Sequence, residues 1–429
     1  MADASKPAST SLRSTVASVR NRLIPASEAI ATVAVGALFS MVLMPALFRR
    51  ESWFWYSSGD AWFVLKAARY VSAGALGFLY EANPLFVSTP LGPIVLAPVA
   101  WVAYRFGLTF SRDPFSIAHP TVWPLYLAYS LLWSVVFYHA VRTLAETLRL
   151  ERHRLRIDAS AGFLVVAPTF IVWGHMEDFM AVAFLLFCVR DVIDENWRRA
   201  TWALGFAIAF KQFAVLALPL VLWQMPKREK IPGAVRASVL PGALAAFTLA
   251  VDWSHASRAL LGAQIGYLAP LAHVTPWWPG TLGHTESATI ERVLAFAAAV
   301  GVGWFARRVR DPKALLAAFG VVLLIRPAFE PVVYFYYLAP CMVFFLLHER
   351  LTSGRMRRTL GAAVLLHVVL ESRWALTRSL WWPMTVVLCG VMAGPAIAAL
   401  RRASTSSATA AAVTDDDSGS PGLDSAHGP

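Results

Sequence analysis

The chain has 429 residues, of which 57% are hydrophobic and only 15% are charged. A soluble protein of this length needs more charge to cover its surface, so the composition excludes an ordinary soluble globular protein and predicts that apolar residues face lipid. The net charge of +12 comes from basic residues in short segments between apolar runs. That pattern is typical of membrane loops near anionic lipid rather than of a nucleic-acid-binding surface.

Both ends of the chain are polar. Residues 1–25 carry four basic side chains before the first apolar run, 26–48, and predict a cytoplasmic N-terminal tail. The run is long enough to span a membrane and no cleavage site of small residues follows it, so we interpret it as a span rather than a signal peptide. Residues 403–429 are rich in Ser, Thr, Ala, Asp and Gly and are predicted to form a disordered cytoplasmic tail.

Between the tails, residues 26–402 are predicted to form one all-α domain, a polytopic transmembrane helical bundle. Twelve apolar runs carry this prediction: 26–48, 85–104, 120–141, 158–175, 177–193, 200–223, 234–252, 289–306, 314–328, 332–347, 359–372 and 380–400. Basic clusters predict the cytoplasmic loops, because Lys and Arg concentrate on that side of membrane proteins. These clusters are 149–156, 198–199, 227–230, 307–310 and 355–358.

Two of the runs do not fit simple crossings, so about ten to twelve membrane segments are expected, some short or re-entrant. The run 85–104 contains several prolines, which break helices, and a full crossing there would put the basic cluster 149–156 outside. The run 200–223 is flanked by basic residues at both ends and interrupted by Lys211, which suits two half-helices that turn back.

This topology places "WGHMED" (173–178) outside, together with the loops 49–84 and 253–288. Strict alternation would place "WGHMED" inside; we favour the outer location. No internal repeat is visible, which argues against a transporter built from inverted halves. Histidines in the loop 253–288 are interpreted as solvated.

The first outer loop carries Asp60, followed by apolar residues at helical spacing from Ala61 to Tyr80, with Lys66 and Arg69 on another face. This pattern predicts an amphipathic helix lying in the membrane interface. A carboxylate there suits a general base that takes a proton from a sugar hydroxyl. Asp60 equally suits the N-cap of the following helix, and its position alone does not separate the two roles.

A second polar group, His175, Glu177 and Asp178, falls between two apolar runs with no room for a long loop. Ionisable residues so close to hydrocarbon are costly, and they either form a site or pair with one another. The site would be the surroundings of a metal or a phosphate, or ligands of an acceptor sugar. No metal is predicted, because the three residues lack a diagnostic ligand spacing and the three cysteines all lie inside apolar runs.

Two basic residues lie inside apolar runs. A lysine at the centre of a membrane helix costs about 2.5–3.5 kcal/mol, so Lys211 requires a partner, a cavity or the interface. It would either pair with a buried carboxylate or hold a lipid phosphate. Arg326 could clamp a phosphate through its planar guanidinium or pair with Glu330, which follows it across a proline-bounded turn.

Five segments in this order resemble the polytopic GT-C glycosyltransferases, in particular the actinobacterial polyprenol-phosphate-mannose-dependent mannosyltransferases of glycosyltransferase family 87. The resemblance extends over roughly residues 30–350, and the order and spacing of the segments carry it. The segments are "GD" at 59–60, "LYEANPLFVSTPLGPIVLAPVA", "GHMEDFMAVAFLL", "LGFAIAFKQFAVLALPLVL" and "FEPVVYFYYLAP".

The resemblance implies an inverting transfer of a sugar, mannose by analogy, from a polyprenyl-phosphate donor to a hydroxyl of a cell-envelope glycan or glycolipid. Asp60 would be the catalytic base, and the other substrate-binding candidates would be Glu81, His175, Glu177, Asp178, Lys211, Arg326 and Glu330. The enzyme would be a multi-pass protein of the cell membrane with its active site on the outer face. Beyond the lipid-linked donor no cofactor is implied, and a divalent metal is left open. The alternative function is that of a transporter or flippase of lipid-linked sugars, and a third hypothesis is a non-catalytic membrane scaffold.

Overall fold

The computed structural model describes residues 59–81, 86, 88–107, 123–150, 174–261, 284–329, 335–372 and 378–417, with Ile30, Ala31 and Ala34. Over these residues the regular elements are thirteen α-helices and two short 3-10 helices, and no strand occurs. The predicted all-α fold is therefore confirmed for this part of the chain. The predicted N-terminal tail and nearly all of the runs 26–48 and 158–175 lie outside it.

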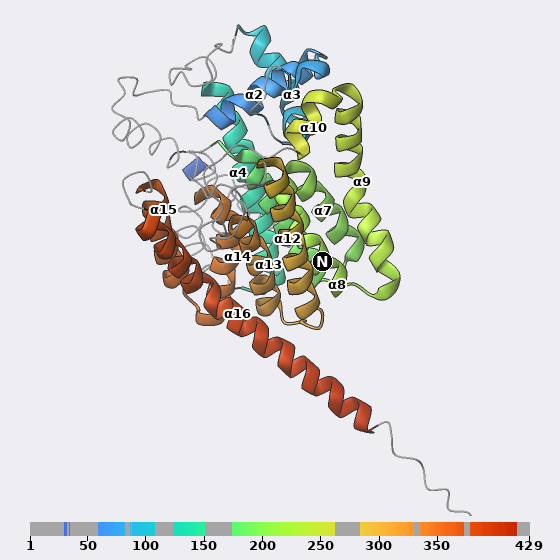
Figure 1. Ribbon diagram of the computed structural model, residues 1–429, viewed down its shortest axis with the longest axis vertical. Coiled ribbons are helices and arrows are strands. Elements are labelled where there is room, and N and C mark those ends of the chain that lie inside the picture. Colours follow the sequence, from blue (N-terminus) through green and yellow to red (C-terminus); the bar gives the residue numbers. More distant parts are fainter. Residues whose placement is uncertain are drawn as a thin grey trace, which may run out of the picture.

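Most helices form one elongated bundle (Figure 1). Helices α6, α13 and α14 are its centre, because most of their residues are buried. Phe137 of α4 stacks on Phe179 of α6 with ring centroids 4.3 Å apart. The bundle helices are α4 (Trp123–Thr147), α6 (Met176–Ile193), α7 (Trp197–Phe210), α8 (Ala217–Gln224), α9 (Lys227–Val251), α12 (His284–Phe305), α13 (Pro312–Phe329), α14 (Phe335–Ser353), α15 (Arg357–Glu371) and α16 (Arg378–Asp417).

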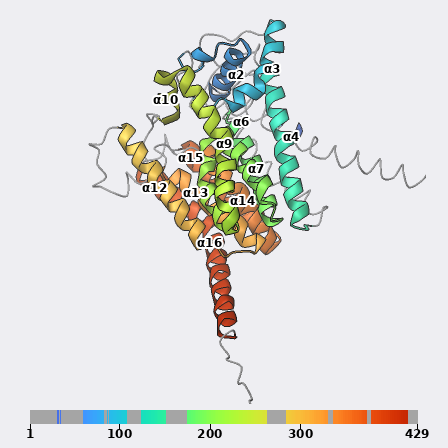
Figure 2. The same cartoon turned by 90° about the vertical axis from the view of Figure 1, so that its right-hand side faces the viewer.

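A cap of short helices lies at one end of the bundle, opposite the end from which α16 projects (Figures 1 and 2). It consists of α2 (Gly59–Ser72), the 3-10 helix η1 (Leu76–Phe78), α3 (Leu91–Arg105) and α10 (Trp253–Leu261). The helix predicted over Ala61–Tyr80 is shorter in the structure, because the chain turns at Gly74 with φ of +69°.

Helix α2 is also more buried than the predicted interfacial helix. Seven of its residues are buried, and the guanidinium of Arg69 lies 3.5 Å from the ring centroid of Tyr104 in α3. Packing of α3 against α2 therefore covers part of the face that the sequence pattern assigned to water and lipid headgroups.

The proline-containing run 85–104 forms a short helix, as predicted. Helix α3 has 15 residues, and at about 1.5 Å per residue it is shorter than the hydrocarbon core of a bilayer, about 30 Å thick. Pro90 occupies its N-cap position and Pro98 lies inside it.

The run 200–223 also breaks as predicted. Helix α7 ends at Phe210, Lys211 is extended with φ −151° and ψ 125°, and the 3-10 helix η2 (Gln212–Leu216) leads into α8. A methyl group built on Gly233 would lie 2.6 Å from Met225 Cε and 3.2 Å from Thr201 Cγ2. Since the end of α8 and the start of α7 approach the same glycine, the two half-helices turn back on themselves.

Three helices in the described part of the chain are long and apolar enough to cross a membrane: Lys227–Val251, Pro312–Phe329 and Leu380–Thr405. The last belongs to α16, which continues to Asp417 and so differs from the predicted disorder after residue 402. The Ala-rich stretch 408–412 explains the difference, because alanine has the highest helix propensity of all residues. Residues 418–429 lie outside the described part.

Candidate functional site

Five helix ends meet where the cap joins the bundle. They are the starts of α2, α6 and α14 and the ends of α7 and α13. Residues far apart in the sequence come together there, and we call them the polar cluster: Asp60, His175, Glu177, Asp178, Lys211, Arg326 and Tyr336. Six of these seven residues are among the sequence-predicted candidates.

Asp60 and His175 form the outer pair of the cluster. The Nε2 atom of His175 lies 2.8 Å from Oδ2 of Asp60. Asp60 lies in the first turn of α2 and its side chain is 49% exposed, whereas the side chain of His175 is only 13% exposed. The imidazole stacks on Tyr336, with ring centroids 3.7 Å apart and 20° between the planes. Asp60 is therefore an accessible carboxylate held beside an oriented histidine.

Gly174 sets the direction of the chain into α6. Its φ is +74°, a left-handed conformation that glycine adopts without steric cost. His175 follows as the N-cap residue of α6, and its side chain makes no capping hydrogen bond. The imidazole is thus available to Asp60, and Glu177 and Asp178 enter the first turn of the helix.

Asp178 forms the inner part of the cluster with two cations. Its side chain has no exposed surface; Lys211 Nζ lies 3.5 Å from Oδ1, and Arg326 Nη1 donates to Oδ2 over 3.3 Å. The guanidinium of Arg326 also lies near the rings of Phe213 and Tyr337, 4.6 and 4.1 Å from their centroids. A buried carboxylate requires such partners, because its desolvation is otherwise prohibitive.

The break at Lys211 explains how the lysine reaches Asp178. Because the residue is extended between α7 and η2, it leaves the helical path at the level where α6 begins. Of the two roles that the sequence left open for Lys211, the pair with a buried carboxylate is present. Its side chain remains 17% exposed, so the lysine is not fully enclosed.

Glu177 is buried against the cap. A methyl group built on Gly92 of α3 would lie 3.0 Å from Glu177 Cγ and 3.1 Å from Oε1, so the glycine allows a close approach of α3 to this side chain. Its Oε1 is fully buried and no described residue hydrogen-bonds it. Buried polar atoms usually have partners, so this carboxylate oxygen is a candidate for contact with a bound molecule.

Two predicted residues are not placed in the cluster. Glu81 is exposed beyond η1 and forms no hydrogen bond or ion pair with any described residue. Glu330 lies outside the described residues, and Asp178 is the carboxylate that pairs with Arg326. No group of three or more His, Cys, Asp or Glu residues suited to a metal occurs in the part of the chain that the structure describes.

The comparisons with known proteins add no family. No protein-family model matches the chain, and neither a curated protein nor a solved structure matches it. The functional interpretation therefore depends on the geometry of the polar cluster and on the segments that resemble the glycosyltransferases.

Aromatic residues of the site were not predicted. Tyr336 and Tyr337 belong to "YFYYLAP", where the sequence showed several tyrosines without separating those that face the cluster, and Phe213 lies in the 3-10 turn after Lys211. The sequence contained one indication of their position, because all three aromatic residues lie within a few residues of a helix break or a proline. Their direction depends on packing that the sequence does not encode locally.

The opposite end of the bundle carries the basic clusters 198–199, 227–230, 307–310 and 355–358, and we call it the basic end. Arg310 Nη1 donates to Gln224 Oε1 over 2.6 Å, which joins the turn after α12 to the end of α8. Arg236 Nε donates to Thr201 Oγ1 over 3.0 Å, which joins α9 to the start of α7. His348 Nδ1 lies 2.9 Å from the carbonyl of Lys313, which joins α13 and α14. Helices α6, α7, α13 and α14 thus run between the polar cluster and the basic end.

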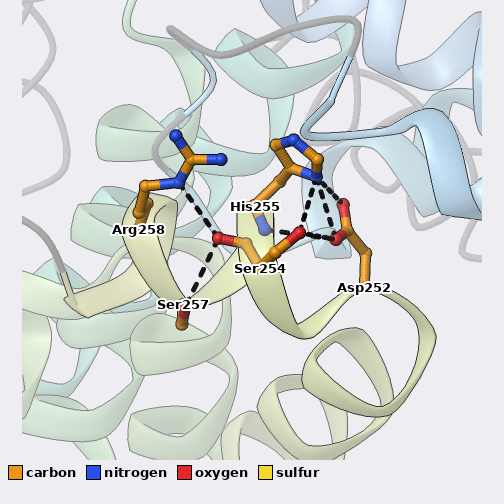
Figure 3. Close-up of polar contacts among 5 residues, drawn as sticks. All are labelled: Asp252, Ser254, His255, Ser257 and Arg258. Carbon is orange, nitrogen blue, oxygen red and sulfur yellow. Dashed lines mark hydrogen bonds and ion pairs between the residues drawn. The ribbon is translucent and has the colours of Figure 1, made fainter.

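A second aspartate–histidine pair caps α10 (Figure 3). Asp252 Oδ1 accepts hydrogen bonds from the backbone N–H of His255 and from Ser254 Oγ, over 3.1 and 3.2 Å, and His255 Nδ1 lies 3.0 Å away. Burial acts to raise the pKa of Asp252, but the hydrogen bonds with His255 and Ser254 outweigh it and the pKa is lowered. These contacts are those of a helix N-cap, and they make the pair a structural counterpart to Asp60 and His175.

Proposed function

We propose that the chain is a membrane glycosyltransferase that moves a sugar, most simply mannose, from a polyprenyl-phosphate donor to a hydroxyl of a cell-envelope glycan or glycolipid. The observation that carries this proposal is the convergence of an accessible carboxylate, Asp60, with two cations, Lys211 and Arg326, at one end of the bundle. Group transfer from a lipid phosphate needs a base for the acceptor and positive charge for the leaving group.

The proposed reaction proceeds with inversion at the anomeric carbon. Asp60 accepts the proton of the acceptor hydroxyl as its oxygen attacks from the face opposite the phosphate. The bond between the sugar and the phosphate oxygen breaks, and the electron pair stays with the polyprenyl phosphate. Lys211 and Arg326 stabilise the negative charge that develops there, and Asp178 holds both cations in place before the donor binds.

The arrangement of charge supports an outer active site in a multi-pass protein of about ten to twelve membrane segments. Because Lys and Arg concentrate in cytoplasmic loops, the basic end is assigned to the cytoplasm. The polar cluster at the opposite end then faces outward, where the cap of α2, α3 and α10 covers it. The prenyl chain of the donor would lie in the surrounding lipid.

The decisive measurement is transfer of labelled mannose from polyprenyl-phospho-mannose by purified protein, comparing wild type with Asp60→Asn and Asp60→Ala. We expect kcat to fall between about 100- and 10,000-fold in both variants, because neither side chain accepts the proton. Asparagine favours a helix start as aspartate does, so Asp60→Asn separates chemistry from folding.

The matched control is Asp252→Asn, which removes the other carboxylate that lies beside a histidine at a helix start. This variant should retain wild-type transfer. Near-wild-type transfer by Asp60→Asn would exclude the general base. Absence of transfer by the wild-type protein, together with movement of a lipid-linked sugar across proteoliposome membranes, would favour a flippase instead.

A further inference from the structure

We infer that the basic end of the bundle binds the headgroup of an anionic phospholipid. Two cations carry this site: Lys230 in the first turn of α9 and Arg307 directly after α12. Both belong to basic clusters that the proposed transfer reaction does not use. The site lies at the end of the bundle opposite the polar cluster and does not depend on the transfer reaction.

Two tryptophans hold the two cations, and we call these four residues the cation–indole cluster. Lys230 Nζ lies 4.2 Å from the ring centroid of Trp223, and Arg307 Cζ lies 3.9 Å from that of Trp304. The two indoles contact each other edge to face, with centroids 4.9 Å apart and 84° between their planes. The cluster therefore joins the end of α8, the start of α9 and the end of α12.

Close packing between α8 and α12 supports the cluster. A methyl group built on Gly303 of α12 would lie 3.0 Å from Trp223 Cδ1, so the glycine allows this indole to lie against the helix. The next residue, Gln224, is buried and donates from Nε2 to the carbonyl of Ala306 over 2.7 Å. These contacts fix the indole on which one cation lies, and a site formed in advance reduces the ordering cost of binding.

Neither cation of the cluster is paired with a carboxylate of the described residues. Glu229, the acidic residue next to Lys230, pairs instead with Arg236, whose Nη2 lies 2.9 Å from its Oε2. Asp311, which follows the second basic cluster, accepts a hydrogen bond from the backbone N–H of Ala314 at the start of α13. Both cations can therefore donate hydrogen bonds to an anion, and phosphate accepts such bonds well.

Exposed apolar side chains on α12 favour a lipid as the carrier of this anion. Trp304 is 51% exposed, and Val300, Phe296 and Val293 are exposed at intervals of three or four residues along the same face. Figure 2 shows α12 at the edge of the bundle. Tryptophan is typical of the membrane interface, and basic pockets between membrane helices bind lipid phosphates. An acyl chain can follow this face while the headgroup contacts the cations, whereas a nucleic acid or an acidic protein has no use for it.

The test measures how phosphatidylglycerol raises the midpoint of thermal unfolding of the purified full chain in a neutral detergent at high salt. Wild type is compared with Lys230→Gln/Arg307→Gln. Each protein is referred to its own midpoint in phosphatidylcholine, so a loss of stability is not mistaken for a loss of binding. We expect the apparent dissociation constant of phosphatidylglycerol to rise about 30-fold, because each cation near an anionic lipid contributes about fivefold.

The matched control is Arg228→Gln/Arg308→Gln. It removes the same charge from the same two basic clusters, and both residues are exposed. Because salt screens exposed charges, this variant should bind phosphatidylglycerol as wild type does. Equal losses in the two variants, or an unchanged dissociation constant in Lys230→Gln/Arg307→Gln, would overturn the site. Stabilisation of wild type by phosphatidylcholine or by glycerol phosphate as strong as that by phosphatidylglycerol would also overturn it.

Discussion

Asp178 organises the inner part of the polar cluster, because one fully buried carboxylate serves two cations from different helices. Lys211 follows α7 and Arg326 lies in the last turn of α13, so the Asp178 side chain links three helices at one point. In the proposed reaction the same arrangement keeps both cations in place for the anionic donor, and neither is left unpaired in an apolar environment.

Replacement of Asp178 by asparagine should therefore destabilise the protein strongly. The variant leaves the buried Arg326 and the partly buried Lys211 without their countercharge, and removal of one partner from a buried ion pair typically costs about 3–5 kcal/mol. The measurement is the midpoint of thermal unfolding in detergent micelles. Asp252→Asn should change that midpoint little, since asparagine also caps helices. Equal midpoints for the two variants would contradict the pairing described for Asp178.

At the scale of elements, close packing between α13 and α14 holds Arg326 and Tyr336 at the level of the cluster. Gly320 of α13 lies close to Phe345 of α14, since a methyl group built on the glycine would lie 2.5 Å from Cε1 of that ring. The glycine lets the two helices approach each other, as small residues do between membrane helices.

Gly320→Ala should consequently cost about 1–3 kcal/mol of stability, because an added methyl in a packed core forces neighbours to move. Gly301→Ala in α12 is the control, since no atom lies within 4 Å of its added methyl group. That substitution should be neutral or stabilising, because alanine favours helix. Thermal unfolding of both variants in the same detergent distinguishes them, and a Gly320→Ala variant as stable as wild type would refute the close approach.

At the scale of the whole molecule, the polar cluster and the basic end lie at opposite ends of the bundle. The orientation of the protein in the membrane can therefore be measured by labelling a residue near each end. Cysteines placed at Glu81 beyond η1 and at Arg355 between α14 and α15 are both exposed. Cys188 and Cys341 are buried, so a Cys389→Ala background leaves little native reactivity. Met176 within "GHMED" is fully buried and unsuited to labelling.

An impermeant thiol reagent applied to intact cells should label Glu81→Cys and spare Arg355→Cys. In permeabilised cells the reagent should label both variants, because the membrane no longer excludes it. The reasoning is that basic loops remain in the cytoplasm. Labelling of Arg355→Cys alone in intact cells would reverse the proposed orientation and move the polar cluster to the inner side.

The amino-acid sequence alone determined the helical class, most helix positions, the short α3 and the break at Lys211. These features depend on composition, on the length of apolar runs, on proline and on a charged residue inside an apolar run, all of which act locally along the chain. It also marked every member of the polar cluster except Tyr336, most of them because ionisable side chains in or beside apolar runs are costly. The burial of α2 and the helical extension of α16 were not predicted: the first depends on α3 packing against it, and the second on helix propensity prevailing over polar composition.

Only the tertiary structure showed which polar side chains of the cluster contact one another. Asp60 with His175, and Asp178 with both Lys211 and Arg326, are contacts across 115, 33 and 148 positions of sequence. The spacing of residues along the sequence does not predict these contacts. They depend on how the packing of α6, α7, α13 and α14 brings five helix ends together. For the same reason the sequence did not show that the carboxylate of Asp60 lies beside His175; the structure did.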